Sequence, residues 1–146
     1  MKSRHPNFRP PSPEIEQRAD EYLQRLSLEE KIDLIGGAPP EGHLTVANEK
    51  AGIPGFRLAD GPVGLHWWTT ASTTYPACIC SAASWDRELL YRIGQGIGRD
   101  ARARGIHIVL APGVNIYRSP LCGRNFEYLG EDPYLSATLA VQYIQG

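Results

Sequence analysis

The chain has 146 residues, a formal net charge of −1 and an apolar fraction of 42%. This length suits one small domain, and the apolar fraction suffices for a core, so wholesale disorder is excluded. Nucleic-acid binders carry a basic patch, so the near-neutral charge predicts no nucleic-acid partner. No apolar run is as long as a membrane span or the core of a secretory signal. We therefore expect a cytoplasmic protein with no membrane partner.

The N-terminal part of the chain predicts a lead-in followed by two helices. Residues 1–12 are polar and rich in proline, which is typical of a flexible segment. Ser12 and Pro13 form an N-cap and first-turn pair, and the apolar residues after them recur at helical spacing. The stretch 27–30, SLEE, has the form of a capping box and predicts a second helix over 28–35.

The rest of the chain alternates predicted strands and helices. Short apolar runs predict strands over 56–59 and 106–110, the second typical of a parallel sheet covered on both faces. Residues 63–83 show no clean period and predict an irregular loop with room for one short strand. Helical spacing predicts helices over 84–104 and from Asp132 onward. This order predicts an α/β fold with parallel strands.

Glycines interrupt the helix predicted over 84–104. Gly94, Gly96 and Gly98 each weaken a helix by up to about 1 kcal/mol relative to alanine. We interpret them as positions where the helix lies close against a sheet. Gly105 is typical of the residue that follows a helix C-terminus.

The three cysteines predict neither a disulfide framework nor a metal site. The chain has an odd number of cysteines, Cys78, Cys80 and Cys122, and its sequence shows no secretory signal. The spacing of Cys78 and Cys80 is not that of a zinc knuckle, and no histidine or cysteine cluster completes it. We expect buried or partly buried thiols.

Asp60 is the first candidate binding residue. It follows the predicted strand over 56–59 directly. Ligands of parallel α/β folds bind at the carboxyl ends of strands, and a carboxylate there can accept hydrogen bonds from neighbouring sugar hydroxyls. Asp60-Gly61 is also an ordinary turn pair, and spacing alone favours the turn.

The loop over 114–131 is the second candidate region. It follows the strand over 106–110, and long loops of this kind are commonly functional. Arg124 offers a planar fork of donors for hydroxyls or carboxylates. A buried arginine needs a partner, which Glu127 or Glu131 could supply. A surface ion-pair network on a solvated loop fits the spacing equally well.

Three neighbouring side chains add a weaker signal. Trp67 and Trp68 could form an apolar platform for a sugar face, beside His66. Tandem tryptophans more often serve packing, and His66 is merely compatible with a polar pocket.

Six motifs resemble glycoside hydrolase family 3, the β-glucosidase-like family. They are LSLEEKI (26–32), GIPGFRLADGPVG (52–64), ASWD (83–86), APGVNI (111–116), GRNFE (123–127) and GEDPYLS (130–136). The similarity runs from about Leu26 to Gly146. It implies the N-terminal portion of a (β/α)8 TIM-like barrel, incomplete, with a lead-in over 1–12 and a partial family 3 domain over 13–146.

The family resemblance also implies an activity. Its members are exo-acting retaining β-glycosidases that hydrolyse terminal β-linked glucose, using two carboxyl groups about 5 Å apart as nucleophile and acid/base. Both carboxyl groups, and a Lys-His pair that binds sugar hydroxyls, would lie beyond Gly146. The resemblance implies no metal ion and no organic cofactor.

The resemblance assigns site residues within this chain. Asp60 matches an aspartate that hydrogen-bonds the sugar in the subsite before the scissile bond, and Arg124 matches an arginine that contacts the same sugar. Glu127 and Glu131 are expected to hold Arg124 and to shape its loop. The expected partner is a small carbohydrate or glycoside.

The length of the chain limits these expectations. A (β/α)8 barrel needs roughly 250 residues, so we expect this chain to hold about half of one. Its open strand edge and uncovered apolar sheet face favour aggregation. We therefore expect poor folding and no hydrolysis without the missing half or a partner chain. A non-catalytic sugar-binding remnant and a partner-dependent subunit are the alternatives.

Overall fold

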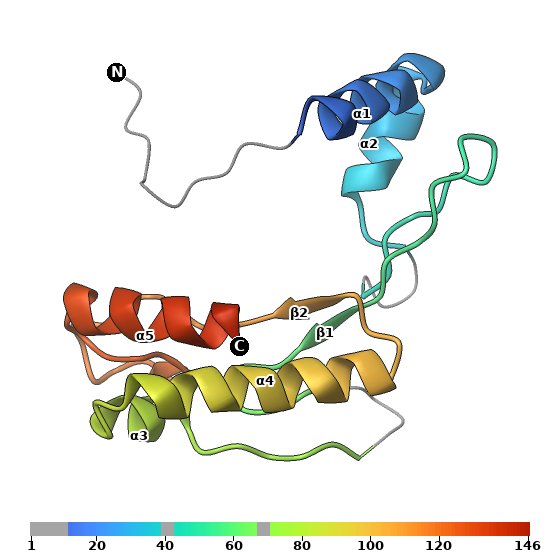
Figure 1. The fold of residues 1–146 in the computed structure, drawn as a ribbon. Helices are drawn as coiled ribbons and strands as arrows, with labels where there is room; N and C mark the ends of the chain where they lie inside the picture. The colour runs from blue at the N-terminus through green and yellow to red at the C-terminus, as the bar shows by residue number, and fades with distance from the viewer. Residues whose placement is uncertain (1–11, 39–42, 67–70) are drawn as a thin grey trace. The chain divides into compact units, whose positions relative to one another are not determined.

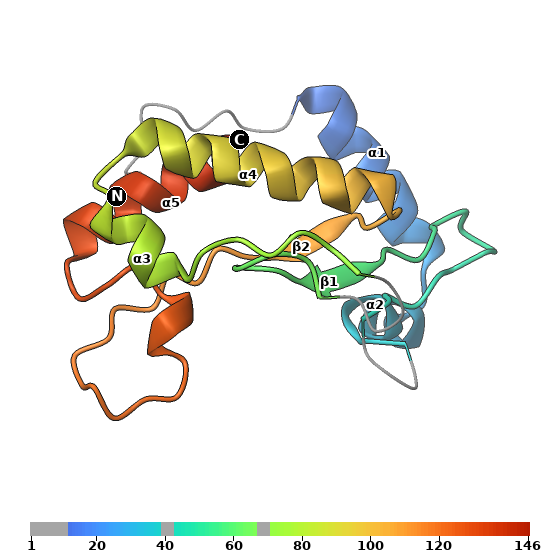
Figure 2. The same ribbon diagram turned by 90° about the horizontal axis from the view of Figure 1, so that it is seen from below.

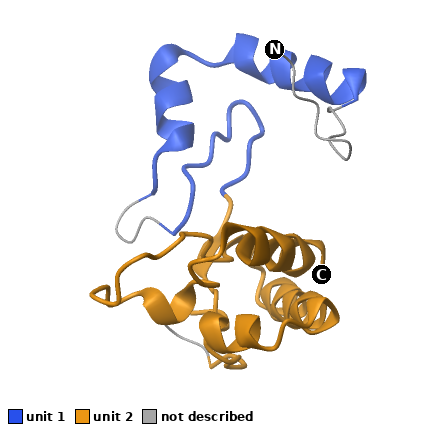
Figure 3. Cartoon of the chain, turned by 90° about the vertical axis from the view of Figure 1, so that its left-hand side faces the viewer, with its two compact units in different colours: residues 1–55 blue, residues 56–146 orange. Residues whose placement is uncertain are grey.

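The computed structural model describes residues 12–38, 43–66 and 71–146, drawn as ribbons in Figures 1 and 2. They belong to two compact units, 1–55 and 56–146 (Figure 3). The expected flexible lead-in lies outside the described residues except for Ser12. Trp67 and Trp68, considered above as a sugar platform, also lie outside them.

The first unit contains the two predicted helices, α1 (Pro13–Arg25) and α2 (Leu28–Ile35). The capping box before α2 is complete. The Ser27 hydroxyl accepts a hydrogen bond from the Glu30 backbone N–H at 3.2 Å, and the Ser27 N–H donates to the Glu30 carboxylate at 2.7 Å. Two of the orphan donors at this helix start are thereby satisfied, which confirms the local prediction.

The second unit is built around two parallel strands, β1 (Leu58–Asp60) and β2 (Ile108–Leu110). In their register Leu58 lies opposite Ile108, and Asp60 lies opposite Leu110. The described residues of this unit also form three helices and one 3-10 turn: α3 (Cys78–Ala83), α4 (Arg87–Ala103), η1 (Asn125–Glu127) and α5 (Pro133–Gln145). The predicted parallel α/β architecture is confirmed.

Two helix boundaries differ from the predictions. Cys78–Ala83 forms α3, so the irregular loop or short strand expected there was wrong for these residues. A run of six small and apolar residues has no clear helical period, and tertiary burial of one side of α3 decides its conformation. Helix α4 begins at Arg87 rather than at 84, because the Asp86 carboxylate caps it by accepting from the Leu89 N–H at 3.0 Å.

Helices α4 and α5 lie side by side and cover one face of the two-stranded sheet (Figures 1 and 2). Ala59 of β1 is fully buried on this face, and Val109 of β2 packs against the same core. Successive strand residues point to opposite faces. Ile108 and Leu110 therefore point the other way and are 41% and 45% exposed. In the described residues the expectation of a sheet covered on both faces is therefore not met, and the partly exposed apolar face agrees with the expectation for part of a barrel.

Gly94 permits the close contact between α4 and α5. A Cβ atom built on Gly94 would lie 2.1 Å from the backbone oxygen of Tyr143 in α5. The close approach is thus between two helices, and our interpretation of a contact with the sheet was wrong for this glycine. Gly105 has a φ of 67°, which confirms it as the left-handed residue after α4.

The three cysteines differ in their exposure. Cys78 is buried as expected, whereas Cys80 and Cys122 are exposed, so that expectation was wrong for these two. Within residues 12–38, 43–66 and 71–146, no group of three or more His, Cys, Asp and Glu side chains is arranged to hold a metal ion. None of the described helices combines the length and the apolar character needed to cross a membrane.

Candidate functional site

Asp60 lies at the carboxyl end of β1, as predicted. Its register partner Leu110 is the last residue of β2, so the two strands end at the same edge of the sheet. The Asp60 residue is exposed to solvent at this edge. A ligand that approaches the carboxyl edge of the sheet can therefore reach its carboxylate.

The turn predicted by Asp60-Gly61 is also present. The Gly64 N–H donates to the Gly61 carbonyl at 3.3 Å, and the His66 N–H donates to the Asp60 carbonyl at 2.8 Å. The backbone of Asp60 is thus held by strand β1 on one side and by the turn on the other. The two interpretations of Asp60, turn residue and strand-end ligand, are compatible because the turn is what presents the side chain.

Arg124 and Glu127 form a bidentate ion pair in the loop after β2. The Arg124 Nη2 donates to Glu127 Oε2 at 3.0 Å, and Arg124 Nε donates to Glu127 Oε1. The Arg124 side chain is 68% exposed, whereas that of Glu127 is only 12% exposed. The Arg124 guanidinium also lies 5.8 Å from the centre of the Tyr128 ring, within cation–π range. One edge of the guanidinium is used by the pair, and the other edge faces solvent with donors for a ligand.

The ion pair keeps both groups charged. Hydrogen bonding to Arg124 lowers the pKa of the Glu127 carboxyl, outweighing the opposite effect of burial. The same hydrogen bond and the carboxylate charge raise the pKa of Arg124. Glu127 is therefore ionised at neutral pH and holds the Arg124 guanidinium by two hydrogen bonds, while its supporting role at a sugar site stays a prediction.

Glu127→Gln should remove a pH-dependent part of the stability. Because the folded-state pKa of Glu127 lies below that of an unfolded glutamate, about 4.3, the pair stabilises the folded state above that pH and loses this contribution as the pH falls through the lower value. We expect Glu127→Gln to lower the free energy of unfolding at pH 7, with a gap from the parent protein that narrows as the pH falls further below about 4.3. Urea unfolding at pH 7 and at pH values below about 4.3 measures the gap. An equal gap at all of them would contradict the assignment.

Glu131 takes a different position from Glu127. It is exposed and directly precedes Asp132, whose carboxylate caps α5 by accepting from the Tyr134 N–H at 2.8 Å. In the described part of the chain no hydrogen bond or ion pair joins Glu131 to Arg124. The support of Arg124 by Glu131 stays a prediction.

A backbone bridge just after β2 joins the two ends of the loop that carries Arg124. Gly113 near its start forms a parallel bridge with Tyr128 near its end. A Cβ atom on Gly113 would lie 2.6 Å from the Glu127 backbone oxygen, so this approach requires glycine. Within the loop, the Asn125 side chain donates to the Ser119 carbonyl at 2.9 Å. Arg124 therefore projects from a backbone that has local restraints.

Two buried residues that the sequence did not single out contact the Asp60 turn. The Cys78 thiol donates to the Pro62 carbonyl at 3.3 Å, and the Tyr143 hydroxyl donates to the Gly61 carbonyl at 3.2 Å. Burial, with a smaller effect from the Glu127 charge, raises the pKa of Cys78 to about 11, so the thiol keeps its proton at neutral pH. Tyr143 and Gly61 are 82 residues apart, and no local sequence signal connects them.

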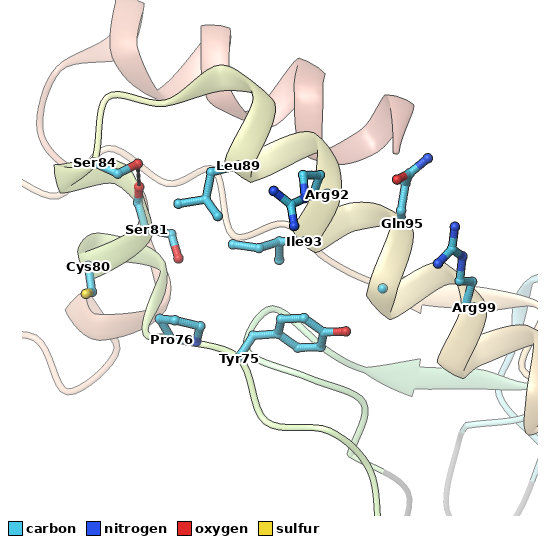
Figure 4. Close-up of a pocket in the computed structure, with 11 residues that line it drawn as sticks. Tyr75, Pro76, Cys80, Ser81, Ser84, Leu89, Arg92, Ile93, Gln95 and Arg99 are labelled. Atoms are coloured by element: carbon cyan, nitrogen blue, oxygen red, sulfur yellow. Dashed lines mark hydrogen bonds between the residues drawn. The ribbon is translucent and has the colours of Figure 1, made fainter.

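A cleft of about 670 Å³ lies elsewhere in the second unit, beside α3 and α4 (Figure 4). Tyr75, Leu89 and Ile93 form much of its apolar lining, and Arg92 and Arg99 contribute charged groups. Neither Asp60 nor Arg124 lines it. This cleft therefore does not coincide with the two predicted sugar-binding residues.

Comparison with known proteins decides the family. Residues 41–146, well over half of the chain, match the model of the glycosyl hydrolase family 3 N-terminal domain. The chain belongs to glycosyl hydrolase family 3. The resemblance seen in the six sequence motifs is thereby confirmed.

The similar proteins from this family are β-glucosidases. Beta-glucosidase BoGH3A of Bacteroides ovatus is 44% identical over 145 aligned positions, which cover 90% of this chain and 19% of that protein. Thermostable beta-glucosidase B of Acetivibrio thermocellus is 42% identical, with 85% and 18% covered. Beta-glucosidase 3B of Thermotoga neapolitana, solved in complex with glucose, is 38% identical with a TM-score of 0.80 over 87% of this chain and 21% of that one.

These matches define how much of a family member is present. The chain spans about a fifth of the length of the curated relatives. Its mixed helix and strand structure is the N-terminal portion of the family's (β/α)8 barrel, which confirms the expected fold class.

Proposed function

We propose that this chain supplies one side of the glucose subsite of an exo-acting retaining β-glycosidase. Asp60 and Arg124 are the sugar-binding residues, and Glu127 holds Arg124. The observation that carries the proposal is the exposed Asp60 at the carboxyl end of β1, in a chain that matches β-glucosidases closely in sequence and fold.

The chemistry of the two side chains suits a sugar. The two oxygens of an aspartate side chain can accept hydrogen bonds from two neighbouring hydroxyls. The outer edge of the Arg124 guanidinium donates to hydroxyl oxygens, and its pairing with Glu127 restricts its orientation. Together they provide acceptors and donors for one monosaccharide.

The catalytic carboxyl groups are assigned outside this chain. Retaining hydrolysis requires a nucleophile and an acid/base about 5 Å apart, and these two groups suffice without a metal ion or an organic cofactor. We assign neither role to a residue between Met1 and Gly146. The chain then contributes substrate binding, and the remaining part of the barrel or a partner contributes the reacting groups.

Hydrolysis of an aryl β-glucoside tests this division. Purified residues 1–146 should release no aryl alcohol above the rate in buffer, whereas the protein made from the full open reading frame, carrying both carboxyl groups, should release β-glucose first, as seen by proton NMR. Turnover by residues 1–146 would refute the assignment of the catalytic groups. Release of α-glucose first would refute retention.

A partner-dependent subunit is the second candidate. The exposed Ile108 and Leu110 favour it, because a soluble monomer rarely leaves the apolar face of a sheet uncovered. Size-exclusion chromatography after co-expression with the remaining part of a family 3 barrel separates the two cases. A stable heteromeric complex with glucosidase activity would support the subunit.

A further inference from the structure

The backbone that presents Asp60 is held from within the core by two donors on different helices. Tyr143 of α5 and Cys78 of α3 bind consecutive carbonyls, those of Gly61 and Pro62. Both donor residues are buried, with exposures of 8% and 4%. If either donor is removed, water therefore cannot easily reach the carbonyl oxygen and replace the lost hydrogen bond.

The turn has little room to shift on its other side. A Cβ atom on Gly61 would lie 2.9 Å from Cγ1 of Val109 in β2 and 3.3 Å from Cδ2 of Leu65. Gly61 is thus enclosed between the neighbouring strand and its own turn. Since Asp60 is bonded directly to Gly61, a displacement of this backbone would redirect the Asp60 carboxylate.

Cys78 also connects this turn with the segment that carries Arg124. It is the first residue of α3, and α3 packs against η1, which ends at Glu127. Burial mainly, and the Glu127 charge to a smaller extent, raise the pKa of the Cys78 thiol. Cys78 therefore binds the Asp60 turn from the start of a helix that packs against the segment bearing Arg124 and Glu127.

We propose that Cys78 and Tyr143 are positioning residues of the sugar subsite, which fix the Asp60 turn by its two carbonyls and, through Cys78, relate it to the Arg124–Glu127 pair. The proposal rests on the sugar-binding function proposed above. Neither residue touches the sugar. Each acts through Asp60, because a subsite discriminates hydroxyls only when its supporting side chains hold it in place.

Three variants and one control test the proposal in the protein made from the full open reading frame. Tyr143→Phe removes one donor and keeps the ring, Cys78→Ala removes the other, and Cys78→Ser restores a donor. Ile97→Val is the matched control, because Ile97 is a core residue of α4 with 2% exposure and the change removes one buried methyl group. Urea unfolding of all four variants measures the free energy of unfolding of each. A loss of glucose affinity can then be compared with the loss of stability in the same variant.

Two readouts are measured for each variant. Calorimetry gives the dissociation constant for glucose, and hydrogen exchange gives the opening of the His66 and Gly64 amides, which donate to Asp60 and Gly61. We expect Tyr143→Phe and Cys78→Ala each to weaken glucose binding about 3- to 10-fold, the effect of one hydrogen bond, and to speed exchange of both amides. Cys78→Ser should recover most of the lost glucose affinity. Ile97→Val should change neither glucose affinity nor amide exchange, even where its loss of stability equals that of the other variants.

The outcomes separate this proposal from the sugar-binding function. Glucose binding by Tyr143→Phe and Cys78→Ala equal to that of the parent overturns the positioning role and leaves the subsite intact. An equal loss in Ile97→Val also overturns it, because general destabilisation would then explain the effect. If the parent binds no glucose, the proposed function fails, and unchanged amide exchange in both variants would refute the restraint independently.

Discussion

Asp60→Ala is expected to weaken glucose binding by about 100-fold in the protein made from the full open reading frame. The substitution removes both carboxylate oxygens, and a hydrogen bond to a charged group contributes about 1.5–3 kcal/mol. Asp60 is exposed, so the change leaves the core untouched and the fold should persist. Calorimetric titration with glucose measures the dissociation constant, and circular dichroism verifies the fold.

Asp33→Ala is the matched control for this experiment. Asp33 is an exposed aspartate in α2, so the variant loses the same charge from the first compact unit, which does not contain β1. Its glucose affinity should equal that of the parent protein. An Asp60→Ala variant that binds glucose as well as Asp33→Ala would show that Asp60 is only a turn residue.

Gly94→Ala is expected to lower the free energy of unfolding by about 3 kcal/mol, at the upper end of the usual cost of overpacking. The added Cβ would meet the backbone oxygen of Tyr143 at 2.1 Å, and backbone atoms of a packed helix cannot rotate away as a side chain can. Helices α4 and α5 must then separate. Urea denaturation followed by circular dichroism measures the change.

Gly98→Ala, one turn further along the same helix, is expected to raise the free energy of unfolding rather than lower it. Among the described residues, no atom outside the neighbouring helix backbone lies within 4 Å of a Cβ at Gly98, so alanine gains helix propensity without a clash. We expect stabilisation by up to about 1 kcal/mol. If both variants were stabilised, helix propensity alone would explain them and the close contact at Tyr143 would be refuted.

Much of the fold was predictable from the sequence because it depends on interactions between near neighbours. The capping box at Ser27 and the caps at Ser12 and Asp132 are satisfied within three residues along the chain, so their residue types indicate the helix starts directly. The two strands and Gly105 were recognisable for the same reason. The strand-end position of Asp60 and the pairing of Glu127 with Arg124 also follow from short spacings.

The helix α3 and the burial of each strand face were decided by tertiary structure. Cys78–Ala83 has no strong local preference, and packing against η1, α4 and α5 makes it a helix. Ile108 and Leu110 have the composition of covered strand residues, yet they are exposed because the described chain places helices on one sheet face only.

For the candidate site too, some residues were recognisable from the sequence and others only from the tertiary structure. The sequence by itself showed the family motifs and singled out Asp60 and Arg124 as candidates, because these depend on residue types at short and fixed spacings. Only the tertiary structure brought Tyr143 to Gly61 across 82 residues and placed the Cys78 thiol on the Pro62 carbonyl. Such contacts exist only after the helices have packed on the sheet, since nothing in the local sequence favours one distant partner over another.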